Sequence, residues 1–227
     1  MAAPFTINAR TAVAATATST STSRVYFQDT QNGIREVVYD NENWNVSNDV
    51  LFSAKRSTPL AVVSWDEGRQ VIPLSTVFRG NIDKGSDSGS NLAALSFKDG
   101  GKVHLRVYYQ APDLSLREHC NDGNWNEGHF NPGVAIKSSA IAATSWIATG
   151  TGVQLRLFWQ DNHGLLRGYR WSRGWESTGS LNLMPVGTHI SAINWDTGNS
   201  VRVYYQANDG TITEEVTHSL RTTILQL

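Results

Sequence analysis

The chain has 227 residues, of which 40% are hydrophobic and 17% are charged, a composition typical of a globular protein long enough to bury a core. Its 19 Lys and Arg residues against 20 Asp and Glu give a formal net charge of −1, which excludes a strongly basic surface for nucleic acid or acidic membranes. No apolar run reaches the roughly 20 residues of a membrane helix. Because the first residues also lack the pattern of a secretory signal, we expect a cytoplasmic protein or one secreted by a non-classical route.

A single cysteine, Cys120, excludes an internal disulfide and a cysteine-rich zinc site. Its position in a predicted strand indicates an inert core thiol. The six histidines share no column of the repeats described below, so they do not form a predicted ligand set. We therefore expect neither a metal nor another cofactor.

The first predicted strand, 24–28, reads Arg-Val-Tyr-Phe-Gln and is followed by turn residues at 29–33 and a second strand at 34–36. Aromatic and β-branched residues on both sides of such a turn predict a hairpin. A Trp-bearing turn at 43–44 comes next, after which a short strand would complete the unit. We predict a first repeat at about 11–53.

The next unit begins in the same way, with a strand at 60–65, but residues 71–78 contain no counterpart of the Arg-Val-Tyr-Phe-Gln pattern. Residues 84–91 are rich in Gly, Ser, Asn and Asp, which is typical of a flexible loop. We predict that 54–90 is the remnant of a repeat.

Three later units carry the complete pattern. Each has a strand that ends in an aromatic residue, then an Arg-x-aromatic-aromatic-Gln strand, then a third strand at a constant offset. The leading residues are Arg106, Arg156 and Arg202, and the repeats cover about 91–137, 138–186 and 187–227.

Four strands in about 40 to 50 residues are typical of a propeller blade. We therefore predict an all-β protein, a β-propeller of four-stranded blades in a single domain spanning 1–227. Four full repeats and one remnant indicate a shortened or open ring, and residues 219–227 could supply a strand that closes it. The alternative is a β-sandwich or barrel with accidental similarity between strands, which the repeated Arg and Gln columns disfavour.

In three repeats an Arg and a Glu are separated by 12 residues. A symmetric hairpin, with its turn near Thr30 in the first copy, would place the two side chains opposite each other on one face. A single exposed pair of this kind contributes at most about 1 kcal/mol, but its recurrence favours a ligand site over a surface ion pair. The pairs are Arg24 with Glu36, Arg106 with Glu118, and Arg202 with Glu214.

Three tryptophans, Trp44, Trp125 and Trp175, recur in polar turns 19 or 20 residues after the leading Arg of their repeats. An indole exposed to water in such a turn is unfavourable unless something covers it. A sugar has an apolar face that covers an indole, and its hydroxyls bond both guanidinium and carboxylate groups, whereas the Glu would repel a phosphate. The residues therefore favour a carbohydrate.

The repeated Arg-Val-Tyr-Tyr-Gln pattern, the Leu-Arg-Glu-His-Cys-Asn-Asp-Gly-Asn-Trp run at 116–125 and the Ala-x-x-Ser-Trp strands resemble the fungal fucose-specific lectins of the Aleuria aurantia type. The similarity covers about residues 12–70 and 91–218. It implies a six-bladed β-propeller that binds L-fucose between adjacent blades, through an Arg and a Glu of one blade and an aromatic residue of the next. The partners implied are fucose-containing glycans or glycoproteins, bound multivalently.

Carried over to this chain, the resemblance implies that the best-furnished site consists of Arg106, Glu118 and, from the following blade, Trp175. Where the next repeat should carry a Glu beside Arg156, it has Gly168. That site is expected to be weak or inactive.

Two further implied sites depend on how the ring is arranged. Arg202 and Glu214 would be completed by Trp44 of the first blade if the ring closes. With fewer blades than the family has, the ring closes early, stays open or assembles from copies as a homo-oligomer.

The third implied pair, Arg24 and Glu36, adjoins the remnant, which lacks the aromatic residue. Trp125 would substitute if the remnant is skipped.

Two other classes of function remain as alternatives. A propeller glycosidase or sialidase needs paired carboxylates, a Tyr nucleophile or an arginine triad in one central pocket, whereas here the carboxylates are dispersed over the repeats. A protein-interaction scaffold of the WD or kelch type has signatures that are missing here. We therefore expect a lectin that is not an enzyme.

Overall fold

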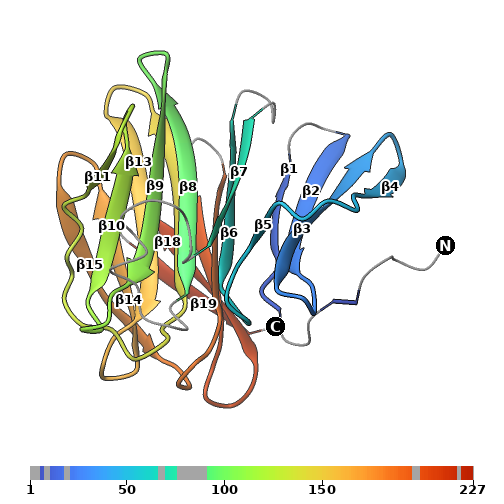
Figure 1. Cartoon of the computed structure of the whole chain (residues 1–227). Coiled ribbons are helices and arrows are strands. Elements are labelled where there is room, and N and C mark those ends of the chain that lie inside the picture. The colour runs from blue at the N-terminus through green and yellow to red at the C-terminus, as the bar shows by residue number, and fades with distance from the viewer. Residues whose placement is uncertain are drawn as a thin grey trace.

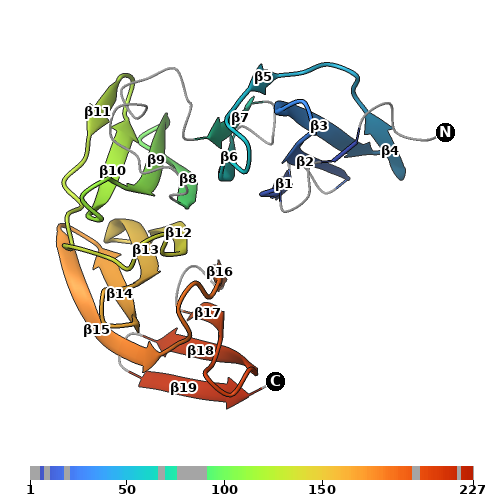
Figure 2. The same ribbon diagram turned by 60° about the horizontal axis from the view of Figure 1, so that its bottom comes forward.

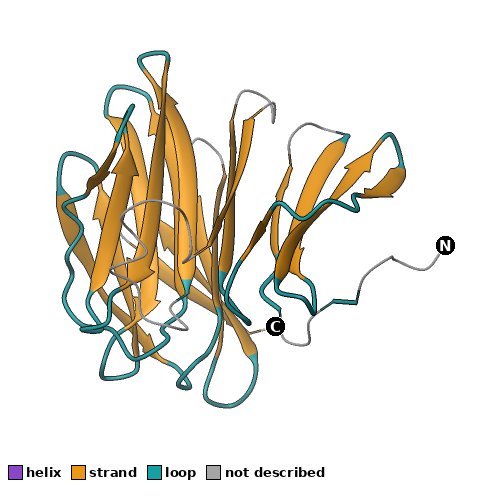
Figure 3. Ribbon diagram, in the orientation of Figure 1, coloured by secondary structure: helices purple, strands orange, loops and turns teal. Residues whose placement is uncertain are grey.

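The computed structural model describes residues 6–7, 11–17, 21–65, 70–75, 91–195, 200–218 and 221–226. They form strands and the loops that join them (Figure 3), which confirms the all-β prediction. Nowhere in these ranges does a helix occur that is long and apolar enough to cross a membrane.

Antiparallel strands that follow one another in the sequence form five sheets in the described part of the chain (Figure 1). The first sheet contains β1 (Ala14–Ala17), β2 (Thr22–Gln28), β3 (Gly33–Asp40), β4 (Asn43–Val46) and β5 (Phe52–Ser53). The second contains β6 (Leu60–Trp65) and β7 (Gln70–Ser75). The third contains β8 (Leu92–Asp99), β9 (Lys102–Gln110), β10 (Leu116–Asn121) and β11 (Trp125–Glu127). The fourth contains β12 (Ile141–Ala148), β13 (Gly152–Gln160), β14 (Leu165–Trp171) and β15 (Trp175–Leu183). The fifth contains β16 (Ile190–Trp195), β17 (Ser200–Gln206), β18 (Ile212–His218) and β19 (Arg221–Gln226).

The sheets are the predicted blades, and the second is the predicted remnant, since the structure describes only a two-stranded sheet there. The predicted loop at 84–91 lies outside the described residues apart from Asn91. The side-chain amide of Asn91 donates to the main-chain oxygens of Ser138 and Ser139, at 3.1 and 3.2 Å.

A blade that lies between two others packs on both faces, because side chains alternate along a strand. In β9, Val107 and Tyr109 belong to an apolar cluster shared with β6, whereas Tyr108 between them belongs to a cluster shared with β12 and β13. Aromatic and branched residues at consecutive positions of the Arg-x-Tyr-Tyr-Gln segment thus serve two different interfaces. This explains why the segment is continuously apolar and does not alternate with polar residues.

The inner strands β1, β6, β8, β12 and β16 follow one another around an axis, and each contacts the next. Figure 2 shows that the sheets form an open arc, with the first and last blades standing apart. The prediction that residues 219–227 could close the ring is wrong, because β19 pairs with β18 as the outer strand of its own blade. A neighbouring hairpin strand requires a shorter loop to close than a strand across the ring does.

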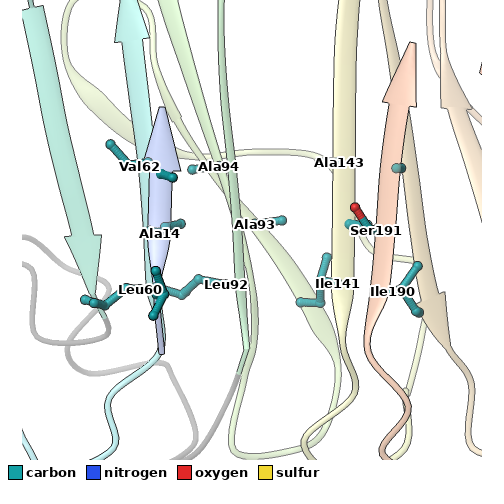
Figure 4. Close-up of a pocket in the computed structure, with 15 residues that line it drawn as sticks. Ala14, Leu60, Val62, Leu92, Ala93, Ala94, Ile141, Ala143, Ile190 and Ser191 are labelled. Atoms are coloured by element: carbon teal, nitrogen blue, oxygen red, sulfur yellow. The ribbon is translucent and has the colours of Figure 1, made fainter. Parts of the chain in front are cut away.

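The inner strands line an axial cavity of about 250 Å³ that is open to solvent. Figure 4 shows side chains from all five inner strands around it, most of them small. Its lining in the described chain consists of alanines, larger aliphatic residues and one hydroxyl, that of Ser191. The axial cavity therefore holds no charged side chain, and the predicted site residues lie elsewhere.

A buried glutamine at the end of the second strand ties each complete blade to the chain segment that leads to the next. Gln110 is fully buried, and its amide nitrogen donates to the carbonyl oxygens of Leu114, Ala135 and Ile136, at 3.1, 3.4 and 2.9 Å. Its amide oxygen accepts the main-chain N–H of Ser138, at 2.9 Å. One side chain thus satisfies buried main-chain groups from a hairpin turn and from the connection after it.

The same clamp recurs at Gln28 and Gln160, which are also fully buried and also bond the turn and the connection. Gln206 of the last blade is exposed, and its side-chain amide donates to the carbonyl oxygen of Gly210 in its own turn, at 3.2 Å. The glutamine column seen in the sequence is therefore a structural feature of the blade-to-blade connection.

We predict that Gln110→Ala lowers the free energy of unfolding by about 3 kcal/mol, because buried main-chain groups lose their partners. Gln206→Ala is the matched control and should change it by less than about 1 kcal/mol, since that amide is exposed. Urea titration of both variants measures the difference. Equal losses in the two variants would contradict a clamp role.

The fifth blade contains a buried carboxyl group, that of Glu215, which is 1% exposed. Among the described residues, its Oε2 has no hydrogen-bond partner. Burial raises the pKa of Glu215 from an ordinary 4.5 to about 7. The folded state therefore favours the neutral acid, and ionising it near neutral pH is unfavourable.

Because the pKa is higher in the folded chain, stability should fall as the pH rises from about 4.5 to 7 and then stay level. We predict that Glu215→Gln is more stable than the parent chain by about 2 kcal/mol at pH 8 and no more stable at pH 4. Thermal and urea unfolding at the two pH values test this. Glu42→Gln, an exposed turn substitution, is the control and should show no such pH-dependent gain.

Candidate ligand sites between the blades

The hairpins β2–β3, β9–β10 and β17–β18 position the predicted Arg and Glu pairs. In the third blade Tyr108 lies directly opposite Glu118, and Arg106 lies opposite Cys120. The other two hairpins have the same register. The expected symmetric register is therefore wrong by two residues, and the Arg reaches the Glu diagonally. Both side chains still lie on one face, because two residues are one full period of a strand.

The first hairpin shows a three-residue unit. Arg24 Nη1 donates to Glu36 Oε2 at 2.8 Å, and the Tyr26 hydroxyl donates to the same oxygen at 2.6 Å. In the last hairpin the corresponding distances, from Arg202 and Tyr204 to Glu214, are 2.8 and 2.7 Å. The Arg and the Tyr together hold the carboxylate in place.

The tyrosine was missed in the sequence, although a signal for it is present. A Tyr stands two residues after the Arg in the three repeats that carry the Glu, and Phe158 takes its place in the repeat that carries Gly168. The hydroxyl and the carboxylate are absent together because each is the hydrogen-bond partner of the other.

In the third blade the carboxylate of Glu118 is buried, with its side chain 5% exposed. Its Oε1 accepts the Tyr108 hydroxyl at 2.9 Å, and its Oε2 accepts the main-chain N–H of Phe130 at 3.3 Å. Gly128 makes room for it, since a Cβ there would collide with the Glu118 carboxyl group. Burial, reinforced by Glu118, raises the pKa of Tyr108, so its hydroxyl stays protonated as a donor.

The guanidinium of Arg106 is placed differently from that of Arg24. Its Nε lies 3.8 Å from Glu118 Oε1, while Nη1 and Nη2 donate to the two carboxylate oxygens of Asp122 at 2.7 and 3.2 Å. His104 Nδ1 lies 2.6 Å from Asp122 Oδ1. Although burial opposes it, hydrogen bonds from Arg106 and His104 lower the pKa of Asp122. Asp122 was not predicted, although it stands two residues after Cys120, the residue opposite Arg106, and so lies diagonally across from the Arg as Glu118 does.

Trp175, at the start of β15, faces the third blade. Its ring centroid lies 6.2 Å from that of Tyr108 and 4.6 Å from that of Phe130. Because Tyr108 also bonds Glu118, the structure brings the predicted Arg106, Glu118 and Trp175 into one interface between the third and fourth blades.

The Arg202 and Glu214 pair lies on the face of the last blade that turns away from the fourth blade. The Arg202 side chain is 36% exposed, whereas that of Glu214 is 5% exposed. Hydrogen bonds from Tyr204 and Arg202 lower the pKa of Glu214. Trp44 lies on β4 of the first blade, 58% exposed beside Tyr39. Figure 2 shows β4 at the opposite end of the open arc from β17 and β18, which carry this pair.

The Arg24 and Glu36 pair faces the remnant, since Tyr26 beside it packs in a cluster with Leu60 of β6. The remnant is not skipped in the ring, because β6 contacts both β1 and β8. Trp125 lies at the following interface, stacked on His119 with a centroid distance of 5.3 Å. The structure therefore does not bring Trp125 to Arg24.

In the fourth blade the site has changed. The guanidinium of Arg156 lies over the Trp146 ring, 4.9 Å from its centroid, and its Nη1 donates to the carbonyl oxygen of Leu155 at 2.9 Å. A Cβ on Gly168 would collide with the Thr178 hydroxyl and lie 3.2 Å from a ring carbon of Phe158. The space that a Glu would need is thus filled.

We predict that Gly168→Glu adds no fucose-binding equivalent and lowers the free energy of unfolding by about 1 to 3 kcal/mol through overpacking. Gly174→Glu is the control, because nothing lies within 4 Å of a Cβ at that turn. Calorimetric stoichiometry and urea unfolding check both expectations. A gained binding equivalent in Gly168→Glu would overturn the assignment of this interface.

Antiparallel blades around an axis, with a donor, a buried acceptor and an aromatic ring meeting at an interface, define a β-propeller with repeated sites suited to a small hydroxyl-rich ligand. The family model of the fungal fucose-specific lectins matches residues 7–79 and 80–221. The chain belongs to this family.

Two relatives give the degree of similarity. The chain is 31% identical to the fucose-specific lectin of Aleuria aurantia over 224 residues, which cover 86% of this chain and 70% of the relative. It is 32% identical to the fucose-specific lectin of Aspergillus oryzae over 234 residues, which cover 89% of this chain and 74% of the relative.

Solved structures of the Aleuria aurantia lectin are also similar, and one is described as a six-bladed β-propeller with a novel mode of fucose recognition. It has 26% sequence identity and a TM-score of 0.78, covering 99% of this chain and 80% of the other. A mutant of that lectin in complex with α-methyl-L-fucoside has 26% identity and a TM-score of 0.77, with the same coverage.

Proposed function

We propose that this lectin binds L-fucose and fucosylated glycans between its blades, with Arg106, Glu118 and Trp175 as its principal site. The observation that carries the proposal is the convergence of these three residues at one interface, through the ring and hydroxyl of Tyr108. The α-methyl-L-fucoside complex of the similar Aleuria aurantia lectin supports the choice of sugar.

The chemistry of the principal site suits one face and one edge of a sugar ring. The indole of Trp175 offers an apolar surface for sugar C–H groups. The guanidinium of Arg106 donates to sugar oxygens, and the carboxylates of Glu118 and Asp122 accept from sugar hydroxyls, as charge-assisted hydrogen bonds. Asp122 and Tyr108 already hold the Arg and the Glu in place, so little side-chain entropy is lost on binding.

The sites of the other two Arg and Glu pairs have fewer ligand-binding residues than the principal site. The Arg24 and Arg202 pairs keep the donor, the carboxylate and the tyrosine, but the structure brings neither Trp44 nor Trp125 to them. We therefore propose one stronger site and two weaker ones. A shallow site for one monosaccharide rarely exceeds micromolar affinity, so the sites together gain by avidity on clustered glycans.

Three observations support a binding protein that is not an enzyme. The Arg and Glu pairs are dispersed over three blades, and the axial cavity is lined by aliphatic residues and Ser191. Burial, followed by the charge of Glu118, raises the pKa of the Cys120 thiol to about 12, so it is protonated and unreactive at neutral pH. The similar proteins are lectins.

We predict that calorimetric titration with methyl α-L-fucoside shows saturable binding, and that Arg106→Ala and Glu118→Gln each weaken the strongest site at least tenfold, about 1.4 kcal/mol or more. Each substitution removes charge-assisted hydrogen bonds to the sugar. Arg117→Ala is the control, because that side chain neighbours Glu118 in sequence but pairs with Asp113 at the surface.

Unchanged affinity and stoichiometry in both site variants would refute the assignment. An aryl fucoside in the same samples tests for catalysis, and steady release of the aryl group would refute the non-enzymatic proposal. A folded chain that binds neither the fucoside nor any sugar on a glycan array would favour the protein-interaction scaffold.

A further inference from the structure

The face of the fourth blade that turns toward the fifth carries two arginines side by side. Arg156 on β13 and Arg170 on β14 are directly opposite each other in the sheet. At the same place in the third blade Arg106 faces Cys120, and in the first blade Arg24 faces Val38. Like charges directly opposite in a sheet repel, so the second arginine is unfavourable to the fold unless something offsets it.

The same face lacks the carboxylate and the tyrosine hydroxyl that accompany the Arg in the other hairpins. Gly168 stands where the other blades carry a Glu, and Phe158 stands where they carry the Tyr that binds it. The hydroxyl of Thr178, on β15, occupies the space above Gly168. Guanidinium and hydroxyl donors therefore replace a carboxylate at this interface.

The charge balance of the site is reversed as well. Arg170 donates to Glu176 at 2.9 and 2.7 Å, with both side chains largely exposed. Two guanidinium groups and this one carboxylate leave a net charge of +1 on this face of the fourth blade. Glu215 lies on the facing side of the fifth blade, and it adds no charge while its carboxyl group is protonated, which its raised pKa of about 7 favours. In the third blade Arg106 is accompanied by Glu118 and Asp122, which leaves −1 when His104 is neutral.

Arg156 itself lacks an acidic partner within the described parts of the chain. Its planar group lies over Trp146, and one N–H is used by the carbonyl oxygen of Leu155. An arginine has five N–H donors, so the edge of the guanidinium keeps further donors for a ligand. Burial, and then the charge of Arg170, lower the pKa of Arg156 to about 10, so it stays charged at neutral pH and an anion beside it would be favoured.

We propose that the interface between the fourth and fifth blades is a second kind of sugar site, which binds an acidic sugar through its carboxylate or sulfate group. The oxyanion accepts from Arg156, with Arg170 alongside, in the geometry that guanidinium groups use for planar or tetrahedral oxyanions. A neutral sugar such as fucose finds Gly168 in place of the Glu that would accept its hydroxyls, and the carboxylate of Glu176 is already paired with Arg170. The inference rests on the proposed lectin function, because it takes the ligand to be a sugar.

The experiment titrates the full chain with methyl β-D-glucuronide and with methyl β-D-galactoside 6-sulfate, using NMR chemical shifts. The neutral methyl β-D-glucoside and methyl β-D-galactoside are the matched ligands. We expect one or both acidic sugars to bind, the neutral sugars to bind at least tenfold more weakly, and added salt to weaken the acidic ones. Binding of the glucuronide or of the sulfate tells which oxyanion the site takes, and either result supports the proposal.

Arg156→Gln should weaken the acidic sugar at least tenfold, because it removes the charge while keeping a side chain of similar length. Arg173→Ala removes an equal charge from an exposed turn of the same blade and should leave the affinity unchanged. If Arg156→Gln does not fold, Arg170→Gln serves in its place, because Arg170 is 47% exposed. Its expected effect is a severalfold loss of affinity.

Three results would overturn the proposal: binding of neither acidic sugar, equal binding of the neutral sugars, or an affinity unchanged in the arginine variants. Excess methyl α-L-fucoside in the same samples separates the two proposals. If the fucoside binds and the acidic sugars do not, only the second site fails. If the acidic sugars bind and the fucoside does not, the assignment to fucose fails while the acidic site remains.

Discussion

The arrangement of the blades depends on a buried amide. Gln28, Gln110 and Gln160 each lie beneath a hairpin turn and satisfy main-chain groups of the segment that leads to the next sheet. Without that amide, the connections would bury unpaired carbonyl groups between apolar sheets, which is strongly unfavourable. The same clamp recurs after the first, third and fourth blades. These blades therefore join the next one with the same geometry, and residues from two neighbouring blades can meet in a site.

Each ligand site combines a local part and a neighbouring part. The local part is the Arg, Tyr and Glu unit of a single hairpin, as at Arg24, Tyr26 and Glu36, and it forms wherever these residues are present. The neighbouring part is an aromatic ring such as Trp175, which only an intact following blade supplies. A blade that lacks this ring therefore weakens the interface beside it and leaves the hairpin unit of its neighbour unchanged. This explains how the interface between the third and fourth blades stays well furnished although the second sheet, in the part of the chain that the structure describes, has two strands.

The blades have also diverged in chemistry. In the third blade a second carboxylate, Asp122, draws the Arg106 guanidinium away from Glu118. In the fourth blade the acidic residue is gone and a second arginine has been added opposite Arg156. A repeat protein can change one interface in this way without disturbing the others, since each blade contacts only its neighbours. The proposed difference in ligand between the fucose-type sites and the fourth blade follows from this independence.

The sequence by itself determined the β class, the repeats, the remnant and the pairing of Arg with Glu on one face. These depend on the two-residue period of a strand and on short hairpin turns, which are local properties. The sequence also contained a signal for the partner of each carboxylate, because the repeats that carry a Glu also carry a Tyr at the position of Tyr108. This partner was not predicted from the sequence. Only the tertiary structure decided which tryptophans reach an Arg and Glu pair: Trp175 lies at the interface of Arg106, whereas Trp44 and Trp125 lie away from the pairs. It also decided that β19 completes its own blade and that the arc is open. These outcomes depend on how whole sheets pack against one another, and contacts between residues far apart in the chain leave no periodic trace in the sequence.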